Sequence, residues 1–306
     1  MERTFTAAAL AAFATLAGLG AAPAAAAEAK LSDGVVRIGV LTDMTGYYSD
    51  LSGPGSALAA KMAIDDFGGK IGGKPIELVS ADHQLKADVA SNIARKWFDE
   101  QKVDVIADLV SSSTALAAMP VAAEKKRILL LSGPGTTGIT GDKCNAYTVH
   151  YTYDNWALAN GTGREVVNDG GKTWFFITAD YAFGHDLEKQ ASEEIAASGG
   201  KILGAVRHPL GASDFSSFLL QAQASGADVV ALANAGGDMI NAIKQANEFG
   251  LTRGGQKVVS LLTFITDIQS VGLAATQGLT FVTAFYWDRD AESRAWSERF
   301  FQRHKR

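Results

Sequence analysis

Short β-branched and aliphatic runs alternate along this chain with segments in which apolar residues recur every three or four positions. Such alternation predicts parallel sheets whose strands are joined by helices on both faces. In one helical segment, for example, Val89, Ile93 and Trp97 share a face. The predicted strands are Val35–Leu41, Ile76–Ser80, Val103–Leu109, Ile128–Leu131, Tyr147–Tyr151, Thr173–Thr178, Lys201–Val206, Asp228–Ala233, Lys257–Leu262 and Leu279–Phe285.

The length of the chain indicates two such units. Its 306 residues exceed the roughly 250 at which a single hydrophobic core stops growing. Strand Tyr147–Tyr151 closes the first unit, and Asp154 with Asn155 forms an N-cap pair that starts a new helix. We therefore predict an α/β fold of two doubly wound parallel-sheet lobes. Residues 28–153 and 283–306 form the first lobe, and residues 154–282 form the second.

The N-terminus has the pattern of a secretory signal peptide. Arg3 precedes an uncharged, Ala-rich run that ends in three alanines at Ala27. Two glycines and a proline interrupt this run, so it falls short of the ~20 strongly apolar residues that a membrane span needs. We expect cleavage near Ala27 and an exported mature protein.

Composition excludes several classes of function. A formal net charge of -5, with Lys and Arg spread along the chain, provides no basic patch for nucleic acid. Cys144 is the sole cysteine and the five histidines are scattered, so neither a disulfide, nor a zinc site, nor any other cofactor is predicted. The chain also contains no GxSxG nucleophile motif. We expect a protein that is not an enzyme.

Two glycine-rich segments resemble nucleotide loops but lack the necessary context. Residues 68–75, GGKIGGKP, place Pro75 where a phosphate loop needs a hydroxyl, and a strand rather than a helix follows. Residues 133–138, GPGTTG, match GxGxxG, yet a crossover of about 10–12 residues or more does not fit before the next strand. We interpret the first segment as a turn and the second as a ligand-contacting loop.

The loops that follow the predicted strands indicate a binding site, because ligands of open parallel sheets bind beyond the carboxyl ends of the strands. In the first lobe these loops are rich in hydroxyl groups and lead into helix starts, which suit a carboxylate. In the second lobe they contain aromatic and small apolar residues. The aromatic candidates are Tyr47, Tyr48, Tyr181, Phe183 and Phe264.

Several longer motifs resemble the branched-chain amino acid-binding (Leu/Ile/Val-binding) branch of the periplasmic solute-binding proteins, which have the type I fold. They are RIGVLTDMTGYYSDLSGPGSALAAKMAIDDFGG, SSSTALAAMPVAAEKKRILLLSGPGTT, ADYAFGHDLEKQ and FSSFLLQAQASGADVVALANAGGDMINAIKQANEFG. The resemblance implies a periplasmic monomer whose two lobes, joined by a hinge, close on a small molecule. Its partner would be the membrane permease of an ABC importer.

The resemblance also implies roles for individual residues. Ser112 and Ser113 would hold the ligand carboxylate, the Pro134 carbonyl and Thr136 would line the same wall, and Asp154 would lie at the cleft near the hinge. Tyr181 and Phe183 match the aromatic loop of the second lobe, and Asn234 with Ala235 matches a position that is often aromatic in amino acid binders.

The chain departs from this family in two respects. Amino acid binders place an acidic residue after the strand Lys257–Leu262, where this chain has Thr263-Phe264-Ile265-Thr266. An unpaired ammonium would be costly to bury there, so we expect a small organic acid, in particular an aromatic one. The alternatives are a branched-chain amino acid with Asp154 as its ammonium partner, or a ligand-sensing subunit for a membrane receptor. Relatives also continue beyond the position of Arg306, so we expect that their C-terminal part and third crossover are missing here.

Overall fold

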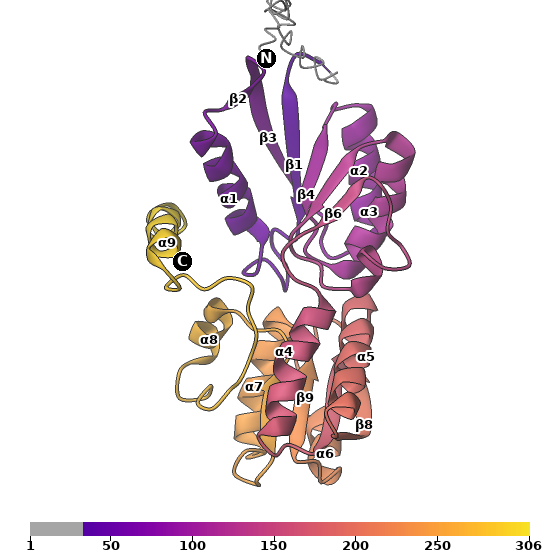
Figure 1. The fold of residues 1–306 in the computed structure, drawn as a ribbon, viewed down its shortest axis with the longest axis vertical. Helices are drawn as coiled ribbons and strands as arrows, with labels where there is room; N and C mark the ends of the chain where they lie inside the picture. The colour runs from indigo at the N-terminus through magenta and orange to yellow at the C-terminus, as the bar shows by residue number, and fades with distance from the viewer. Residues whose placement is uncertain (1–32) are drawn as a thin grey trace, which may run out of the picture. The chain divides into compact units, whose positions relative to one another are not determined.

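Two parallel sheets organise the protein in a computed structural model that describes residues 33–306 (Figure 1). The predicted signal peptide and its cleavage point lie outside these residues. The sheets are covered by helices on both faces, which confirms the predicted fold class of two doubly wound lobes. The sequence boundaries assigned to the two lobes stay a prediction.

The first sheet has the strand order β2-β3-β1-β4-β5-β6. Every neighbouring pair is parallel except the short hairpin of β2 and β3, which turns through Gly72 and Gly73 at φ 56° and 79°. This hairpin confirms that residues 68–75 form a turn. The strands are β1 Val36–Thr42, β2 Lys70–Ile71, β3 Lys74–Asp82, β4 Val105–Asp108, β5 Ile128–Leu131 and β6 Thr148–His150, and the helices are α1 Gly53–Asp66, α2 Ala87–Asp99 and α3 Ser112–Lys125.

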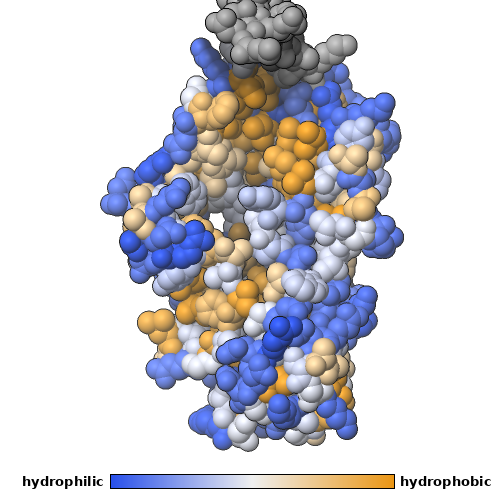
Figure 2. All heavy atoms as spheres, viewed as in Figure 1, coloured by the Kyte–Doolittle hydropathy of each residue, from blue (hydrophilic) through white to orange (hydrophobic). Residues whose placement is uncertain are grey.

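Helices α2 and α3 pack side by side on one face of this sheet, and α1 lies on the other (Figure 1). Gly39 in β1 allows the close approach of α2, because a Cβ atom there would lie 2.3 Å from the Trp97 ring. On β5, Leu129 and Leu131 join this core, whereas Ile128 and Leu130 point the other way and are each 44% exposed. Figure 2 shows hydrophobic surface over the strands beside α1.

The second sheet has the order β10-β9-β7-β8, with all neighbours parallel. Side chains of β7 alternate between two cores, so that Trp174 and Phe176 pack on one face while Phe175 and Ile177 pack on the other. Burial on both faces explains its continuous apolar sequence. The strands are β7 Thr173–Ala179, β8 Lys201–His208, β9 Val229–Ala233 and β10 Lys257–Ser260, and the helices are α4 Asn155–Asn168, α5 Ala182–Ala197, α6 Ser216–Ala224, α7 Gly236–Glu248 and α8 Ile265–Val271.

The predicted strand Leu279–Phe285 is wrong, because the structure has no strand there. A β-branched run becomes a strand only where its backbone pairs with a sheet edge. Here Val282 instead packs against α4, where a Cβ atom on Gly161 would lie 2.6 Å from it. The chain then continues into α9, Ala291–His304, which contacts α1. Among the described residues, no helix is long and apolar enough to cross a membrane.

Candidate functional site

The start of α3 forms the centre of the candidate site in the first lobe. Asp108 and Leu109, just before it, have φ values of 81° and 54°, a left-handed conformation that costs free energy in non-glycine residues and is typical of functional sites. The Ser112 hydroxyl oxygen accepts hydrogen bonds from the backbone N–H groups of Gly135 (3.2 Å) and Thr136 (3.1 Å). Ser112 therefore ties the helix start to the loop after β5.

That loop, Gly133–Thr137, is held tightly on several sides. A Cβ atom on Gly133 would lie 2.6 Å from the Val110 Cα atom, so only glycine fits there. The Nε2–H group of His150 donates to the Pro134 carbonyl oxygen at 2.7 Å, since a carbonyl can only accept. Thr136 caps a single 3₁₀ turn, η1 Thr137–Ile139. The loop leads to no crossover helix, as the sequence predicted.

Asp108, which ends β4, and His83, which follows β3, are buried ionisable groups at the carboxyl ends of two strands that β1 separates. Asp108 accepts a hydrogen bond from the Ser132 hydroxyl at 3.0 Å, and burial raises its pKa. His83 follows β3, is fully buried, and accepts the Leu85 N–H at Nδ1, 3.1 Å away. Burial lowers the pKa of His83 to about 4, so the imidazole is neutral at pH 7. This edge of the sheet is therefore polar but contains no buried cation.

Aromatic side chains from both lobes meet beside the Gly133–Thr137 loop. The Tyr48 and Tyr181 hydroxyls are 2.6 Å apart, and the rings of Tyr181 and Phe183 are 5.9 Å apart. Tyr153 donates to the Gly133 carbonyl oxygen at 2.8 Å, and its ring contacts that of Phe264 edge-on at 6.3 Å. These five residues are called the aromatic cluster below. Burial raises the pKa of all three tyrosines, which are therefore neutral phenols.

A second buried polar group lies on the other face of the second sheet. The Nδ1–H of His208 donates to the Pro209 carbonyl oxygen (2.9 Å), so Nε2 accepts from the Asn234 amide (3.0 Å). Asp238 accepts the Gly211 N–H at 3.0 Å, and burial raises its pKa to about 6. His208 packs against Phe215 and thus into the core behind the sheet. This network fixes the loop after β8.

The structure brings most of the predicted ligand residues together and sets three apart. Tyr47 is 51% exposed, Asp154 caps α4 by accepting the Ala157 N–H at 2.8 Å, and Asn234 bonds His208. Their roles as ligand residues stay predictions, like those of the others. The residues that lie near one another are Ser112 and Ser113 at the start of α3, Pro134 and Thr136 in the loop after β5, and Tyr48, Tyr181, Phe183 and Phe264 in the aromatic cluster.

Sequence reasoning missed three residues that border the site. Tyr153 and Asn155 flank the predicted lobe boundary, where Asn155 was identified only as part of a helix start. Asp186 lies inside α5 and within the motif ADYAFGHDLEKQ, but no role was assigned to it there. It accepts hydrogen bonds from the Thr137 N–H at 2.7 Å and from the Asn155 side-chain amide at 2.9 Å. Its place in this motif, one helical turn after Phe183, was the signal that pointed to it.

Several buried polar atoms at strand ends have no hydrogen-bond partner. They include Ser111 Oγ before α3, Thr178 Oγ1 in β7 and Asn155 Oδ1 at the start of α4. Buried polar atoms are nearly always paired in proteins, so these atoms retain hydrogen-bonding capacity for a ligand or for water. The arrangement suits binding of a small molecule with an anionic end and an apolar end.

Comparison with known proteins supports this interpretation. Residues 35–306 match the family model described as periplasmic binding protein. A periplasmic binding protein from Burkholderia mallei is 54% identical with a TM-score of 0.87, and the match covers 89% of this chain and 72% of that one. An ABC transporter solute-binding protein from Rhodopseudomonas palustris BisB5, in complex with 3,4-dihydroxybenzoic acid, is 25% identical with a TM-score of 0.80, over 89% and 75% of the two chains.

Among curated proteins, the Leu/Ile/Val-binding protein homolog 6 of Brucella melitensis is 25% identical over 260 residues, which are 83% of this chain. The chain spans 65% of the length of that relative. The similarity therefore extends over most of the residues that form the two sheets.

Proposed function

Because this chain belongs to the periplasmic binding protein family, we propose that it captures an aromatic acid outside the cytoplasmic membrane and delivers it to an ABC importer. The family and its fold bind small molecules as parts of ABC transport systems. The observation that supports the ligand class is the aromatic cluster, which lies directly beside the loop bonded to Ser112.

The start of α3 is suited to hold the ligand carboxylate. Backbone N–H groups in the first turn of a helix have no partner within the helix, and the helix dipole favours an anion there. Ser113 adds a hydroxyl in this turn, and Ser111 Oγ is buried without a partner. Each hydrogen bond to a charged group contributes about 1.5–3 kcal/mol. A carboxylate on Ser112, Ser113 and Thr136 would thus be bound without a cation.

The aromatic cluster is suited to hold a flat ring between the two lobes. Tyr48 comes from the first lobe and belongs to the same hydrophobic core as Phe183 and Ala235 of the second. Aromatic contacts contribute about 0.5–1.5 kcal/mol per pair beyond the area that they bury. A ligand that touches both lobes favours the closed state over the open one and thus shifts the population toward closure.

The loop after β10 favours an organic acid over an amino acid. The loop Thr263–Thr266 contains no acid, and the next residue, Asp267, is engaged with the backbone N–H of Phe264 at 2.8 Å. Burial raises the pKa of Asp267 to about 6. An ammonium group beside this loop would therefore lack a dedicated partner, and burying it would be costly.

Ligand-induced thermal stabilisation tests this proposal. Benzoates and cinnamates should raise the melting temperature more than leucine, isoleucine or valine at equal concentration. The effect is measurable, since a ligand at a hundred times its dissociation constant stabilises the folded state by about 2.7 kcal/mol. A larger shift with leucine than with every aromatic acid would contradict the proposal.

The second candidate is a branched-chain amino acid, which the name of the Brucella relative favours. Asp154 would then pair with the ligand ammonium. The Asp154 carboxylate already accepts the Ala157 N–H through Oδ1, and its second oxygen would have to reach the ligand. Replacing Asp154 with asparagine would weaken leucine binding under this candidate, but would leave binding of an aromatic acid unchanged under the first.

A further inference from the structure

Asp186 joins parts of both lobes next to the site. Its Oδ2 atom accepts the Thr137 N–H at 2.7 Å and the Asn155 Nδ2–H at 2.9 Å, while Oδ1 accepts the Thr137 hydroxyl at 2.8 Å. Thr137 ends the loop of the first lobe, Asn155 begins α4, and Asp186 lies on α5. These three residues are called the clasp below.

The clasp lies on the same face of α5 as part of the aromatic cluster. Phe183, Asp186 and Gln190 are spaced i, i+3 and i+7, which places them on one side of a helix. Gln190 donates to the Thr137 hydroxyl at 3.5 Å, and a Cβ atom on Gly135 would lie 2.8 Å from the Phe183 ring. This face of α5 therefore rests directly on the Gly133–Thr137 loop.

Asn155 makes the connection stiffer. Its backbone N–H donates to the Gly135 carbonyl oxygen at 2.6 Å, and its side-chain amide also donates to the Phe183 carbonyl oxygen at 3.0 Å. Asn155 is the first residue of α4 and directly follows the N-cap residue Asp154. It therefore lies at the predicted start of the second lobe. The side chains of Asp186 and Asn155 therefore connect the Gly133–Thr137 loop, the start of α4 and helix α5 to one another.

The charge of Asp186 cannot itself favour an anionic ligand. A carboxylate near a site for another carboxylate repels it, by an amount that depends on distance and screening. Any benefit of Asp186 to binding must therefore come from the geometry that its hydrogen bonds impose. If only the charge matters, removing Asp186 should strengthen binding of an anionic ligand. If the geometry matters, removing it should weaken that binding.

We propose that Asp186 is a positioning residue that sets the length of ligand the site accepts. This inference rests on the proposed function. The clasp fixes the separation between the loop at which the carboxylate binds and the ring of Phe183, so one spacing between carboxylate and ring fits best. Without the clasp, α5 and the loop can shift relative to each other, and ligands of other lengths fit equally well.

Dissociation constants for three acids of increasing length, benzoate, phenylacetate and 3-phenylpropionate, test this inference by calorimetry. The variants are Asp186→Ala, which removes the clasp, and Thr137→Val, which removes one of its hydrogen bonds but keeps the backbone donor. Asp180→Asn is the matched control, because Asp180 is also an acid at the start of α5 but bonds His185 (2.7 Å) instead of the loop. Melting curves verify that each variant folds.

We expect the wild-type protein to prefer one acid by about tenfold or more, equivalent to about 1.4 kcal/mol. Asp186→Ala should weaken binding of that acid and bring the three constants to within about threefold. Thr137→Val should change them in the same direction by less, and Asp180→Asn should change each by less than about twofold.

Other results would overturn the inference. Tighter binding of all three acids by Asp186→Ala would mean that only its charge matters, and uniform weakening with an unchanged preference would mean a merely structural role. Equal binding of the three acids by the wild-type protein would also contradict it, while leaving the proposed function intact. If the wild-type protein bound none of these acids, both the proposed function and the inference would be wrong. Thr137→Val decides the question if Asp186→Ala does not fold.

Discussion

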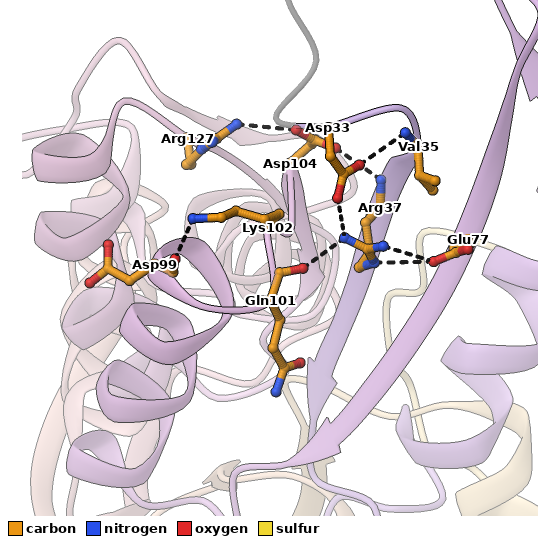
Figure 3. Close-up of polar contacts among 9 residues, drawn as sticks. All are labelled: Asp33, Val35, Arg37, Glu77, Asp99, Gln101, Lys102, Asp104 and Arg127. Atoms are coloured by element: carbon orange, nitrogen blue, oxygen red, sulfur yellow. Dashed lines mark hydrogen bonds and ion pairs between the residues drawn. The ribbon is translucent and has the colours of Figure 1, made fainter.

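The two ends of the first sheet differ in how they use polar groups. At the amino ends of β1, β3 and β4, Arg37 donates to Glu77 at 3.0 Å, to Asp33 at 3.3 Å and to the Gln101 carbonyl oxygen at 2.7 Å (Figure 3). Arg37 also receives support through its backbone N–H, which donates to Asp104 at 2.9 Å. At the carboxyl ends the polar side chains are mostly buried, and they include the hydroxyls of Ser111, Ser112 and Thr136 as well as His83 and Asp108.

The polar groups at the two ends of the sheet differ in their exposure to water. We therefore expect the amino ends to affect mainly stability and the carboxyl ends mainly ligand binding. The Glu77 side chain is 51% exposed, so water screens its ion pair and little free energy depends on it. The hydroxyl of Ser112 is buried, and removing a buried partner exposes the full cost of an unpaired group. Substitutions at the carboxyl ends should therefore have large effects, and those at the amino ends small ones.

The largest expected effect comes from replacing both Ser112 and Ser113 with alanine. The change removes two hydroxyls from the proposed carboxylate site and leaves the N–H groups of Gly135 and Thr136 without their acceptor. Binding of an aromatic acid should weaken at least tenfold, because each hydrogen bond to a charged group contributes about 1.5–3 kcal/mol. Calorimetry measures this loss, and far-ultraviolet circular dichroism should stay unchanged. Unaltered affinity would mean that the carboxylate binds elsewhere. The carboxyl ends of the first sheet would then have no special role in binding.

A smaller, pH-dependent effect is expected from His83, also at the carboxyl ends. Burial lowers its pKa in the folded state to about 4, whereas an unfolded histidine has a pKa of about 6.5. The unfolded state therefore binds more protons between these values, so the contribution of His83 is fully present above pH 6.5 and is lost as the pH falls towards 4. Between pH 7 and pH 5 the loss is about 1–2 kcal/mol.

The variant His83→Asn isolates this contribution, because asparagine can still accept the Leu85 N–H. Its free energy of unfolding, measured with urea at pH 7 and pH 5, should fall less on acidification than that of the wild-type protein. Asp238 and Asp267, whose pKa values burial raises to about 6, act in the opposite direction. They are common to both proteins and cancel in the comparison. Equal pH dependence of the two proteins would show that His83 is not a buried neutral group.

The parts of the site that follow from strand order could be predicted from the sequence. Ser112 and Thr136 follow β4 and β5, which are neighbours in the sheet, so residues after their carboxyl ends had to meet. The absence of a crossover helix after the Gly133–Thr137 loop followed from the short distance to the next strand. The alternation of strands and helices predicted every strand of both large sheets except the short hairpin strand β2.

What the sequence could not predict depends on tertiary packing. The run Leu279–Phe285 has strand composition, yet pairing needs a free edge and Val282 packs on α4 instead. Asn234 follows β9 as expected, but bonds His208 on the face that holds Phe215. Asp186 is an ordinary acid in a helix until α5 is placed against the loop. Contacts between elements distant in sequence, rather than the elements themselves, were the part that remained hidden.

The smallest expected effect tests the other side of the comparison, at the amino ends. Replacing Glu77 with glutamine removes the charge of one partner of Arg37 but leaves its bonds to Asp33 and Gln101. Exposed ion pairs contribute about 1 kcal/mol or less, and salt screens them further. The free energy of unfolding should therefore fall by no more than about 1 kcal/mol at low salt, and the difference should shrink at 0.5–1 M salt, roughly where the screening length reaches about 3 Å. Affinity for the aromatic acid should not change. A loss of unfolding free energy well above about 1 kcal/mol would contradict the weak ion pair. Any weakening of ligand binding would show that the two ends of the sheet are coupled.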